Sequence, residues 1–241
     1  MKKNPLPLVL VSLFVLWAGC ESINLETLGS LTGTAGQTGE LSAETIIGGL
    51  KEALTVGIKN AVLQTAKKGG YSENPTIRIA LPDKLKTAGD TLRTIGLGSQ
   101  VDLLEMKMNE AAEDAASAAT DLFIDAIRNM TFTDAKNILY GSDTAATDYL
   151  RKASFAPLKA RYLPIVTQHM ESLGVIKQYN DLVRRYEALP LVPKVNLSIE
   201  EYVSEQALNG LFTVVGAEEK KIRHDPAART TELLRQIFTA R

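Results

Sequence analysis

The 241-residue sequence predicts an all-α protein: a single multi-helix bundle of seven to nine helices that follows a signal peptide and a flexible tether. Apolar residues make up 45% and charged residues 23% of the chain, which is ordinary for a globular protein and too apolar for a disordered one. From residue 41 onward, apolar residues recur at three- and four-residue steps. Only residues 76–80 alternate as a strand would, and this segment is too short and isolated to define a sheet.

The first 19 residues have the pattern of a secretory signal peptide. Lys2 and Lys3 supply a positive start, and residues 6–17 are apolar apart from Ser12. A membrane-spanning helix needs about 20 apolar residues, so this run is too short to be one. We therefore expect residues 1–19 to be an address that takes no part in the fold.

Cys20, the only cysteine of the chain, directly follows Ala18 and Gly19. Small residues before a cysteine resemble the cleavage box of bacterial lipoproteins, in which the cysteine is lipidated and becomes the new amino terminus. The pattern departs from that family at Trp17, where a branched aliphatic residue is usual. We predict lipidation of Cys20, and the alternative is a secreted protein with an unmodified cysteine.

The predicted location follows from the same segment. A lipidated Cys20 would place the protein in the bacterial cell envelope, anchored to a membrane, and the absence of an Asp after the cysteine favours the outer membrane facing the periplasm. Residues 20–40 are rich in Gly, Ser and Thr and cannot bury a core, so they are expected to form a flexible linker with a root-mean-square span of roughly 25 Å. Residues 41–241 are expected to form the helical domain.

The first half of that domain contains three predicted helices. The first begins with Ser42 as its N-cap and ends at Lys68-Gly69-Gly70. The second opens at Pro82-Asp83 and stops near Gly96 and Gly98. The third is the longest, from about residue 99 to residue 129, and its alanine-rich middle would allow a neighbouring helix to approach closely.

The second half is divided by turn and capping residues. Thr131 or Thr133 is expected to cap a short helix, and Ser142 or Asp143 to start the next one. Pro157 is expected in a first helical turn, and Pro164 at a kink or restart. The later helices are predicted over residues 173–188, from the capping box Ser198–Glu201 onward, and from Asp225-Pro226 to the end of the chain.

The predicted long helix carries most of the candidate chemistry. Glu110, Glu113 and Asp114 are acidic residues within five positions, and paired carboxylates can bind a hard cation or act in acid–base chemistry. A solvated helix face is the simpler interpretation. The Glu-x-x-His pattern of di-iron bundles does not occur with either histidine, so we predict no metal site, no cofactor and no catalytic residue.

Basic residues near the C-terminus are the second group of candidate interaction residues. Arg223 forms a favourable i, i+4 pair with Glu219, and we hypothesise that Arg229 reaches the acidic helix at Glu110 or Glu113. The net charge is −1, and acidic residues are interleaved with the basic ones. Nucleic acid is therefore not an expected partner.

Several segments resemble one bacterial family. They are residues 108–113, 162–166, 207–212 and 225–231, together with Glu218-Glu219 before Ile222-Arg223. They resemble the family known as domain of unknown function 4197, over roughly residues 41–240. Its members are usually described as lipoproteins or secreted proteins, so the resemblance implies a single domain at the envelope and no particular activity.

These observations lead to three hypotheses of function. The first is a lipid-anchored, non-enzymatic envelope protein that binds another envelope protein. The second is a carrier or binder of a small apolar molecule in a cavity between helices, which a continuous apolar cavity would favour. The third is an enzyme that uses the carboxylates of the long helix, which would require two acids to converge in a cleft.

Overall fold

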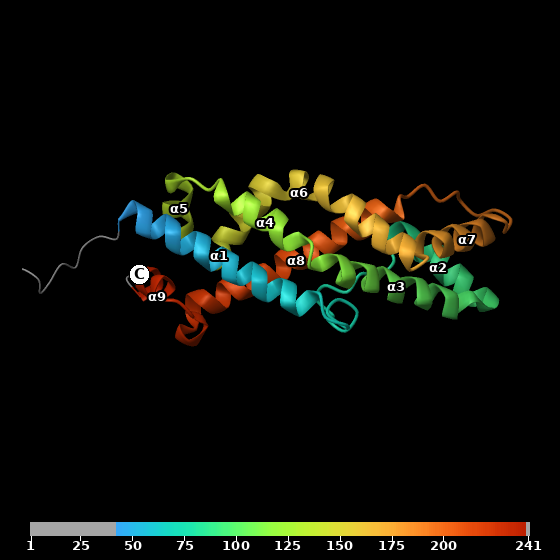
Figure 1. Cartoon of the computed structure of the whole chain (residues 1–241). Helices are drawn as coiled ribbons and strands as arrows, with labels where there is room; N and C mark the ends of the chain where they lie inside the picture. Colours follow the sequence, from blue (N-terminus) through green and yellow to red (C-terminus); the bar gives the residue numbers. More distant parts are fainter. Residues whose placement is uncertain (1–41, 240–241) are drawn as a thin grey trace, which may run out of the picture. The chain divides into compact units, whose positions relative to one another are not determined.

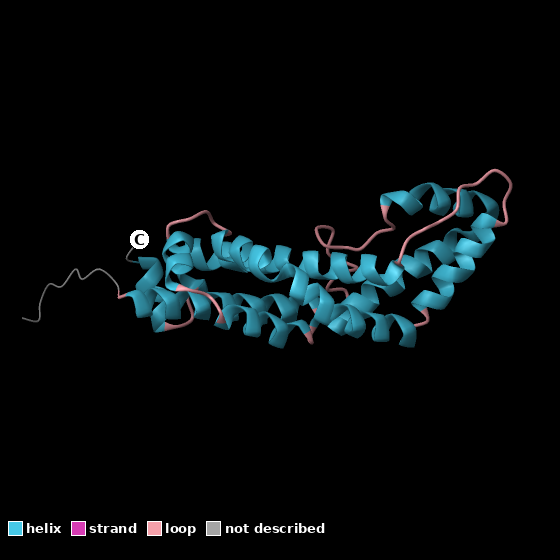
Figure 2. Ribbon diagram, turned by 90° about the horizontal axis from the view of Figure 1, so that it is seen from above, coloured by secondary structure: helices cyan, strands magenta, loops and turns pink. Residues whose placement is uncertain are grey.

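A computed structural model describes residues 42–239 of the chain. The predicted leader, Cys20 and linker lie outside the described residues, so their assignment remains a prediction. The described residues form one compact unit with its own core, and they contain helices and loops but no strand (Figure 2). The predicted all-α class is confirmed.

Most of the helices follow one another along the chain with short connections, and the two long loops are residues 66–82 and 188–198 (Figure 1). Their bounds are α1 Ala43–Thr65, α2 Asp83–Leu92, α3 Gly98–Ala116, α4 Ala119–Arg128, α5 Phe132–Leu139, α6 Ala145–Ser172, α7 Val175–Glu187, α8 Ile199–His224 and α9 Glu232–Thr239. A π-helical stretch, Arg93–Leu97, connects α2 to α3, and a short 3-10 helix, Pro226–Ala228, follows α8.

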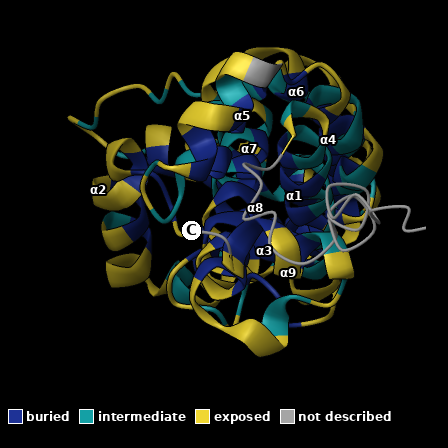
Figure 3. Cartoon of the chain, turned by 90° about the vertical axis from the view of Figure 1, so that its left-hand side faces the viewer, coloured by how far each residue is buried: buried dark blue, intermediate teal, exposed yellow. Residues whose placement is uncertain are grey.

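Helix α8 is the centre of the unit. It packs against α1 and α6 along most of its length and also contacts α3, α7 and α9. Seen from the α5 end, α8 is mostly dark blue and surrounded by the other helices (Figure 3). Gly210 of α8 permits one of the closest contacts, because a Cβ there would lie 2.7 Å from Cε1 of Tyr71. The buried tyrosine ring thus depends on the absence of a side chain at position 210.

The prediction of one long helix over residues 99–129 is wrong in one respect, because a turn at Ser117 and Ala118 divides it into α3 and α4. The break at Ser117 and Ala118 contains neither glycine nor proline, so no local signal marks it. The alanine-rich middle behaves as predicted: Ala111, Ala112 and Ala115 are fully buried. Small side chains there let α3 lie close to its neighbours.

Both prolines of α6 lie inside one continuous helix, so the prediction that Pro157 occupies a first turn is wrong, and Pro164 does not restart the helix. Each proline removes one backbone hydrogen bond. A stripe of buried side chains at every fourth position compensates by packing along the full length of the helix. Its members are Ala146, Leu150, Ser154, Leu158, Tyr162, Val166 and Met170.

Several predicted helix starts are confirmed in their atomic detail. The Oγ of Ser42 accepts the N–H of Thr45, and Thr131 and Asp134 form a capping box. The Oγ of Ser198 accepts the N–H of Glu201, which is the N-cap half of the capping box predicted there. The prediction that Asp225 opens the last helix is wrong. Asp225 caps the 3-10 helix by accepting the N–H of Ala227, and α9 begins six residues after the position of Pro226.

Candidate functional site

The acidic residues of α3 divide between two faces. Glu105, Asn109 and Glu113 recur every four residues and face the loop between α1 and α2. Glu110 and Asp114 are exposed. The first face is therefore occupied by contacts within the protein, and only the second is free for a ligand.

Glu113 is buried and holds the start of the loop. Its Oε1 accepts the backbone N–H groups of Tyr71 and Ser72, each at 3.0 Å, and the Ser72 hydroxyl at 3.0 Å. Its Oε2 accepts the N–H of Gly69 at 3.1 Å. Four donors around one carboxylate leave little capacity for catalysis, so the geometry assigns Glu113 to holding the loop.

Asn109 and Glu105 continue this face. The side-chain amide of Asn109 accepts the N–H of Ile79 and donates to its carbonyl, both at 2.8 Å, as a neighbouring strand would. Glu105 accepts the N–H of Leu81 at 3.2 Å and lies 3.6 Å from Arg78. The strand-like segment 76–80 therefore begins in a turn and continues as a loop whose backbone pairs with helix side chains.

The exposed acids border a solvent-open hollow of about 330 Å³ between α3 and the end of α1. Glu110, Glu113 and Asp114 all line it, together with Ala66, Lys68, Ser72 and Met106. Asp114 also lies 3.8 Å from Nδ1 of His169. The structure therefore brings the three predicted acids to one hollow, but two of them stay in solvent and the third is tied to the loop.

Arg223 is not at the surface. Its guanidinium is fully buried and donates to Oε1 of Glu219 at 2.9 and 2.7 Å, which confirms the predicted i, i+4 pair. It also donates to the carbonyls of Ile138 and Leu139 at the end of α5. Arg223 therefore satisfies the C-terminal carbonyls of one helix from the side of another.

Glu219 binds the N-terminal end of a helix, whereas Arg223 binds a C-terminal end. Its carboxylate accepts the N–H groups of Ala146 and Thr147, at 3.0 and 2.8 Å, in the first turn of α6. The Thr147 hydroxyl adds a bond of 2.7 Å. A carboxylate is favourable at a helix N-terminus, and Arg223 neutralises it. The pair thus joins α5, α6 and α8 inside the protein.

The predicted bridge from Arg229 to Glu110 or Glu113 is wrong. Nε and Nη2 of Arg229 donate to the carbonyls of Ile222 and Arg223, both at 3.0 Å. These carbonyls are left without partners at the end of α8, and Arg229 supplies the donors. Arg229 also lies 6.0 Å from the ring centroid of Phe238 and so helps to hold α9. Opposite charge alone could not identify this role.

An apolar hollow between α2, α3 and α7 is the site that sequence reasoning missed. Its volume is about 30 Å³, close to the space of one water molecule, so the apolar side chains around it are nearly in contact. No charged side chain lines it; the lining residues are Leu81, Leu85, Ala88, Gly89, Leu92, Val101, Leu104, Tyr179, Leu182, Val183, Tyr186 and Val195. The apolar faces of the helices predicted over residues 99–129 and 173–188 were visible in the sequence, but which helices face each other was not.

A third hollow lies between α4 and α6 and has a volume of about 340 Å³. Asp125, Asn129 and Arg161 contribute polar groups to it, and Arg161 lies 3.4 Å from Asp125. Leu122, Ala126 and Pro157 contribute apolar surface. This mixed, ion-paired lining distinguishes it from the apolar hollow beside α2.

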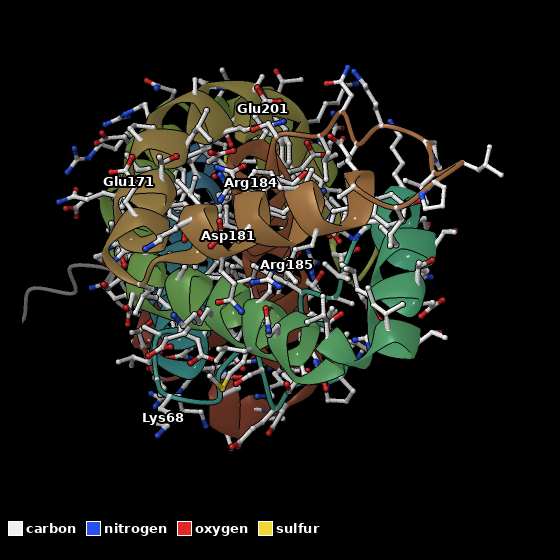
Figure 4. All side chains as sticks on the ribbon, turned by 90° about the vertical axis from the view of Figure 1, so that its right-hand side faces the viewer. Lys68, Glu171, Asp181, Arg184, Arg185 and Glu201 are labelled. Carbon is white, nitrogen blue, oxygen red and sulfur yellow. The ribbon has the colours of Figure 1, made fainter. Side chains whose placement is uncertain are left out.

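Charged side chains at the end of the unit near α7 carry both signs (Figure 4). Asp181, Arg184 and Arg185 lie on α7, and Asp181 pairs with Arg184. Glu171 and Glu201 lie on α6 and α8, and Lys68 lies apart from them at the lower edge of the view. This end therefore presents no single charge sign.

Among residues 42–239, no cluster of three or more histidine, cysteine or acidic residues has the arrangement of a metal site. Within the same range, no helix is both long and apolar enough to cross a bilayer. Cys20, the predicted lipidation site, lies outside that range.

The comparisons with known proteins place the chain in a family and go no further. The family model described as "Protein of unknown function (DUF4197)" matches residues 40–239, nearly all of the helical part, and the chain belongs to this family. No curated protein and no solved structure matches the chain.

Proposed function

We propose that this member of the DUF4197 family is a lipid-anchored protein of the bacterial cell envelope whose helical body is a non-enzymatic binding module. The ligand in this proposal is apolar, and it binds in the hollow between α2, α3 and α7. The lining of that hollow, which contains no charged side chain, is the observation that carries the proposal. Ligand sites in proteins are mostly apolar and span about 300–1,000 Å³, so an apolar ligand enters this hollow only when its walls move apart.

The assignments of the acidic residues support a binding role over an enzymatic one. Glu113 accepts four hydrogen bonds from the α1–α2 loop, and Glu110 and Asp114 are exposed. An enzyme that used this helix would need two carboxylates that converge in a cleft and are free to exchange protons. Glu113, the buried one of the three acids, already holds the α1–α2 loop through its four hydrogen bonds.

The pattern at residues 18–20 supports the anchor, and mass spectrometry tests it. The native protein purified from membranes is compared with the Cys20→Ala variant. We expect a mature amino terminus at Cys20 that carries acyl chains, and a soluble variant. An unmodified chain cleaved elsewhere would contradict the anchor and leave the binding site to be tested independently.

Filling the hollow tests the binding site. Ala88 is 7% exposed and lines the hollow, so Ala88→Leu adds three carbon atoms to it. A fluorescent fatty acid is the probe, and we expect the variant to bind it at least about tenfold more weakly, because the added side chain occupies the space that opens when the walls of the hollow move apart. Ala153→Leu, in the hollow beside α4, is the matched control. Equal binding by both variants, with unchanged thermal stability, would overturn the proposed site.

A further inference from the structure

Leu191, in the loop between α7 and α8, combines two unfavourable features. Its side chain is fully exposed, with a relative accessibility of 104%. Its backbone has φ = +63°, and it is the only non-glycine residue with positive φ among residues 42–239. An exposed leucine alone is common on proteins, but a strained conformation that also presents it to solvent indicates a use outside the folded unit.

The surrounding chain imposes this conformation. Pro190 and Pro193 restrict the backbone on both sides of Leu191. The N–H of Val195 donates to Oε1 of Glu187 at 2.8 Å, and the hydroxyl of Tyr179 donates to the carbonyl of Leu197 at 3.0 Å. The loop projects at the end of the unit near α7 (Figure 1). The prolines and these hydrogen bonds therefore hold the loop in a projecting conformation.

The charges around the loop suggest what it meets. Residues 188–193 carry no charge, and Arg185 and Lys194 flank this run. Neither cation forms a hydrogen bond or ion pair within the described part of the chain, and Asp181 pairs with Arg184. Glu187, which precedes the uncharged run, accepts the N–H of Val195 and keeps its negative charge, so two cations face one acid beside the tip of the loop. An apolar tip between two free cations is complementary to an anionic lipid surface.

We propose that the α7–α8 loop inserts Leu191 into the interface of a bilayer that contains anionic lipids. Burial of the leucine side chain supplies apolar energy, and Arg185 and Lys194 contact the headgroups. Leu191 does not line the apolar hollow, although Val195 of the same loop does, and the proposal does not depend on acylation of Cys20. If the anchor is also present, it holds the loop near the same membrane.

A single tryptophan can report insertion directly. The chain has one tryptophan, Trp17, in the predicted leader, so residues 21–241 contain none. That chain with Leu191→Trp is mixed with phosphatidylcholine vesicles that contain about one third phosphatidylglycerol. We expect a blue shift of the emission and quenching by brominated acyl chains. The matched control is Leu63→Trp, because Leu63 is 74% exposed on α1, away from the loop.

Sedimentation with the same vesicles measures the strength of binding. We expect Leu191→Ser to lower the partition coefficient about tenfold, which corresponds to loss of one buried leucine. The double variant Arg185→Ala/Lys194→Ala should lose the preference for anionic over neutral vesicles. Leu63→Ser should change neither quantity.

Three results would overturn the proposal. The first is an unshifted Leu191→Trp spectrum with anionic vesicles, and the second is an equal loss of binding in the Leu63→Ser control. The third is a blue shift that appears without vesicles and rises with protein concentration, which would make the occupant a second copy of the chain. Each result is independent of the mass spectrum that tests Cys20.

Discussion

The two ends of the helical unit bury different kinds of groups. At the end formed by α5, α9 and the C-terminal half of α8, which we term the ion-pair end, Glu219, Arg223 and Arg229 occupy the termini of neighbouring helices. At the end formed by α2, α7 and the α7–α8 loop, which we term the hollow end, the contacts are apolar and incomplete. Helix ends that meet inside a protein need polar partners, whereas helices packed side by side do not.

This difference indicates which end of the helical unit can accommodate a ligand or a substitution. A protein loses much of its stability when one partner of a buried ion pair is removed, so substitutions at such a pair are poorly tolerated. An apolar gap such as that beside α2 can be filled or emptied with little penalty to hydrogen bonding. Binding is therefore easier to accommodate at the hollow end, and the predictions below test the contrast in order of decreasing effect.

The largest effect is expected for Arg223→Met. The change leaves the buried Glu219 carboxylate without its cation and removes the donors to the carbonyls of Ile138 and Leu139. The free energy of unfolding should fall by about 3–5 kcal/mol in urea denaturation.

Lys159→Met is the matched control, because the Lys159–Glu205 pair is partly exposed and should be worth less than about 1 kcal/mol. Adding Glu219→Leu to Arg223→Met should recover part of the loss, since the unpaired charge is then gone. A loss for Arg223→Met no larger than that of the control would contradict the proposed importance of the ion-pair end.

The second effect concerns Glu113, which lies between the two ends. Glu113→Ala removes the acceptor of three backbone N–H groups, and we expect a loss of about 2–4 kcal/mol. Hydrogen exchange should accelerate at Gly69, Tyr71 and Ser72. Glu110→Ala, on the exposed face, should leave both quantities unchanged, and equal effects of the two substitutions would mean that the loop is held by other contacts.

A pH-dependent effect is expected at Glu218. Burial raises the pKa of this carboxyl, but hydrogen bonds from Lys221, Gln64 and Asn60 outweigh burial and hold the pKa below its usual value. A lowered pKa in the folded state means that the contribution is present above the unfolded value of about 4.3 and is lost as the pH falls through the folded pKa.

Glu218→Gln should therefore remove part of the acid-induced loss of stability below about pH 4.3, an effect of no more than about 1 kcal/mol. Thermal unfolding between neutral and acidic pH measures this difference. Parallel stability profiles of the wild-type protein and the variant would contradict the assignment.

The smallest effect is expected for Leu191→Gly at the hollow end. Glycine adopts positive φ without strain, so we expect the free energy of unfolding to rise by about 0.5–1 kcal/mol in spite of the greater entropy of the unfolded chain. Leu63→Gly, inside α1, should instead lower it by about 1 kcal/mol. A loss of stability in Leu191→Gly would mean that the leucine side chain makes contacts that stabilise the folded protein.

The pattern of residues predicted local features well because their causes lie within a few positions. The all-α class followed from the three- and four-residue periodicity, and Ser42, Thr131 and Ser198 were recognisable as caps from their immediate neighbours. The pair Glu219–Arg223 was predictable for the same reason, since four residues bring two side chains to one face of a helix.

Only the tertiary structure decided what those side chains do. The Glu113 carboxylate meets N–H groups more than 40 positions away, and Arg223 meets carbonyls 84 and 85 positions away. Sequence periodicity shows which face of a helix is buried but not which neighbour covers it, so the apolar hollow and the break after Ala116 were not foreseen. Of the three acids that looked like a candidate site, Glu110 and Asp114 are exposed, and Glu113 ties a helix to a loop, because buried N–H groups need acceptors wherever the chain leaves a helix.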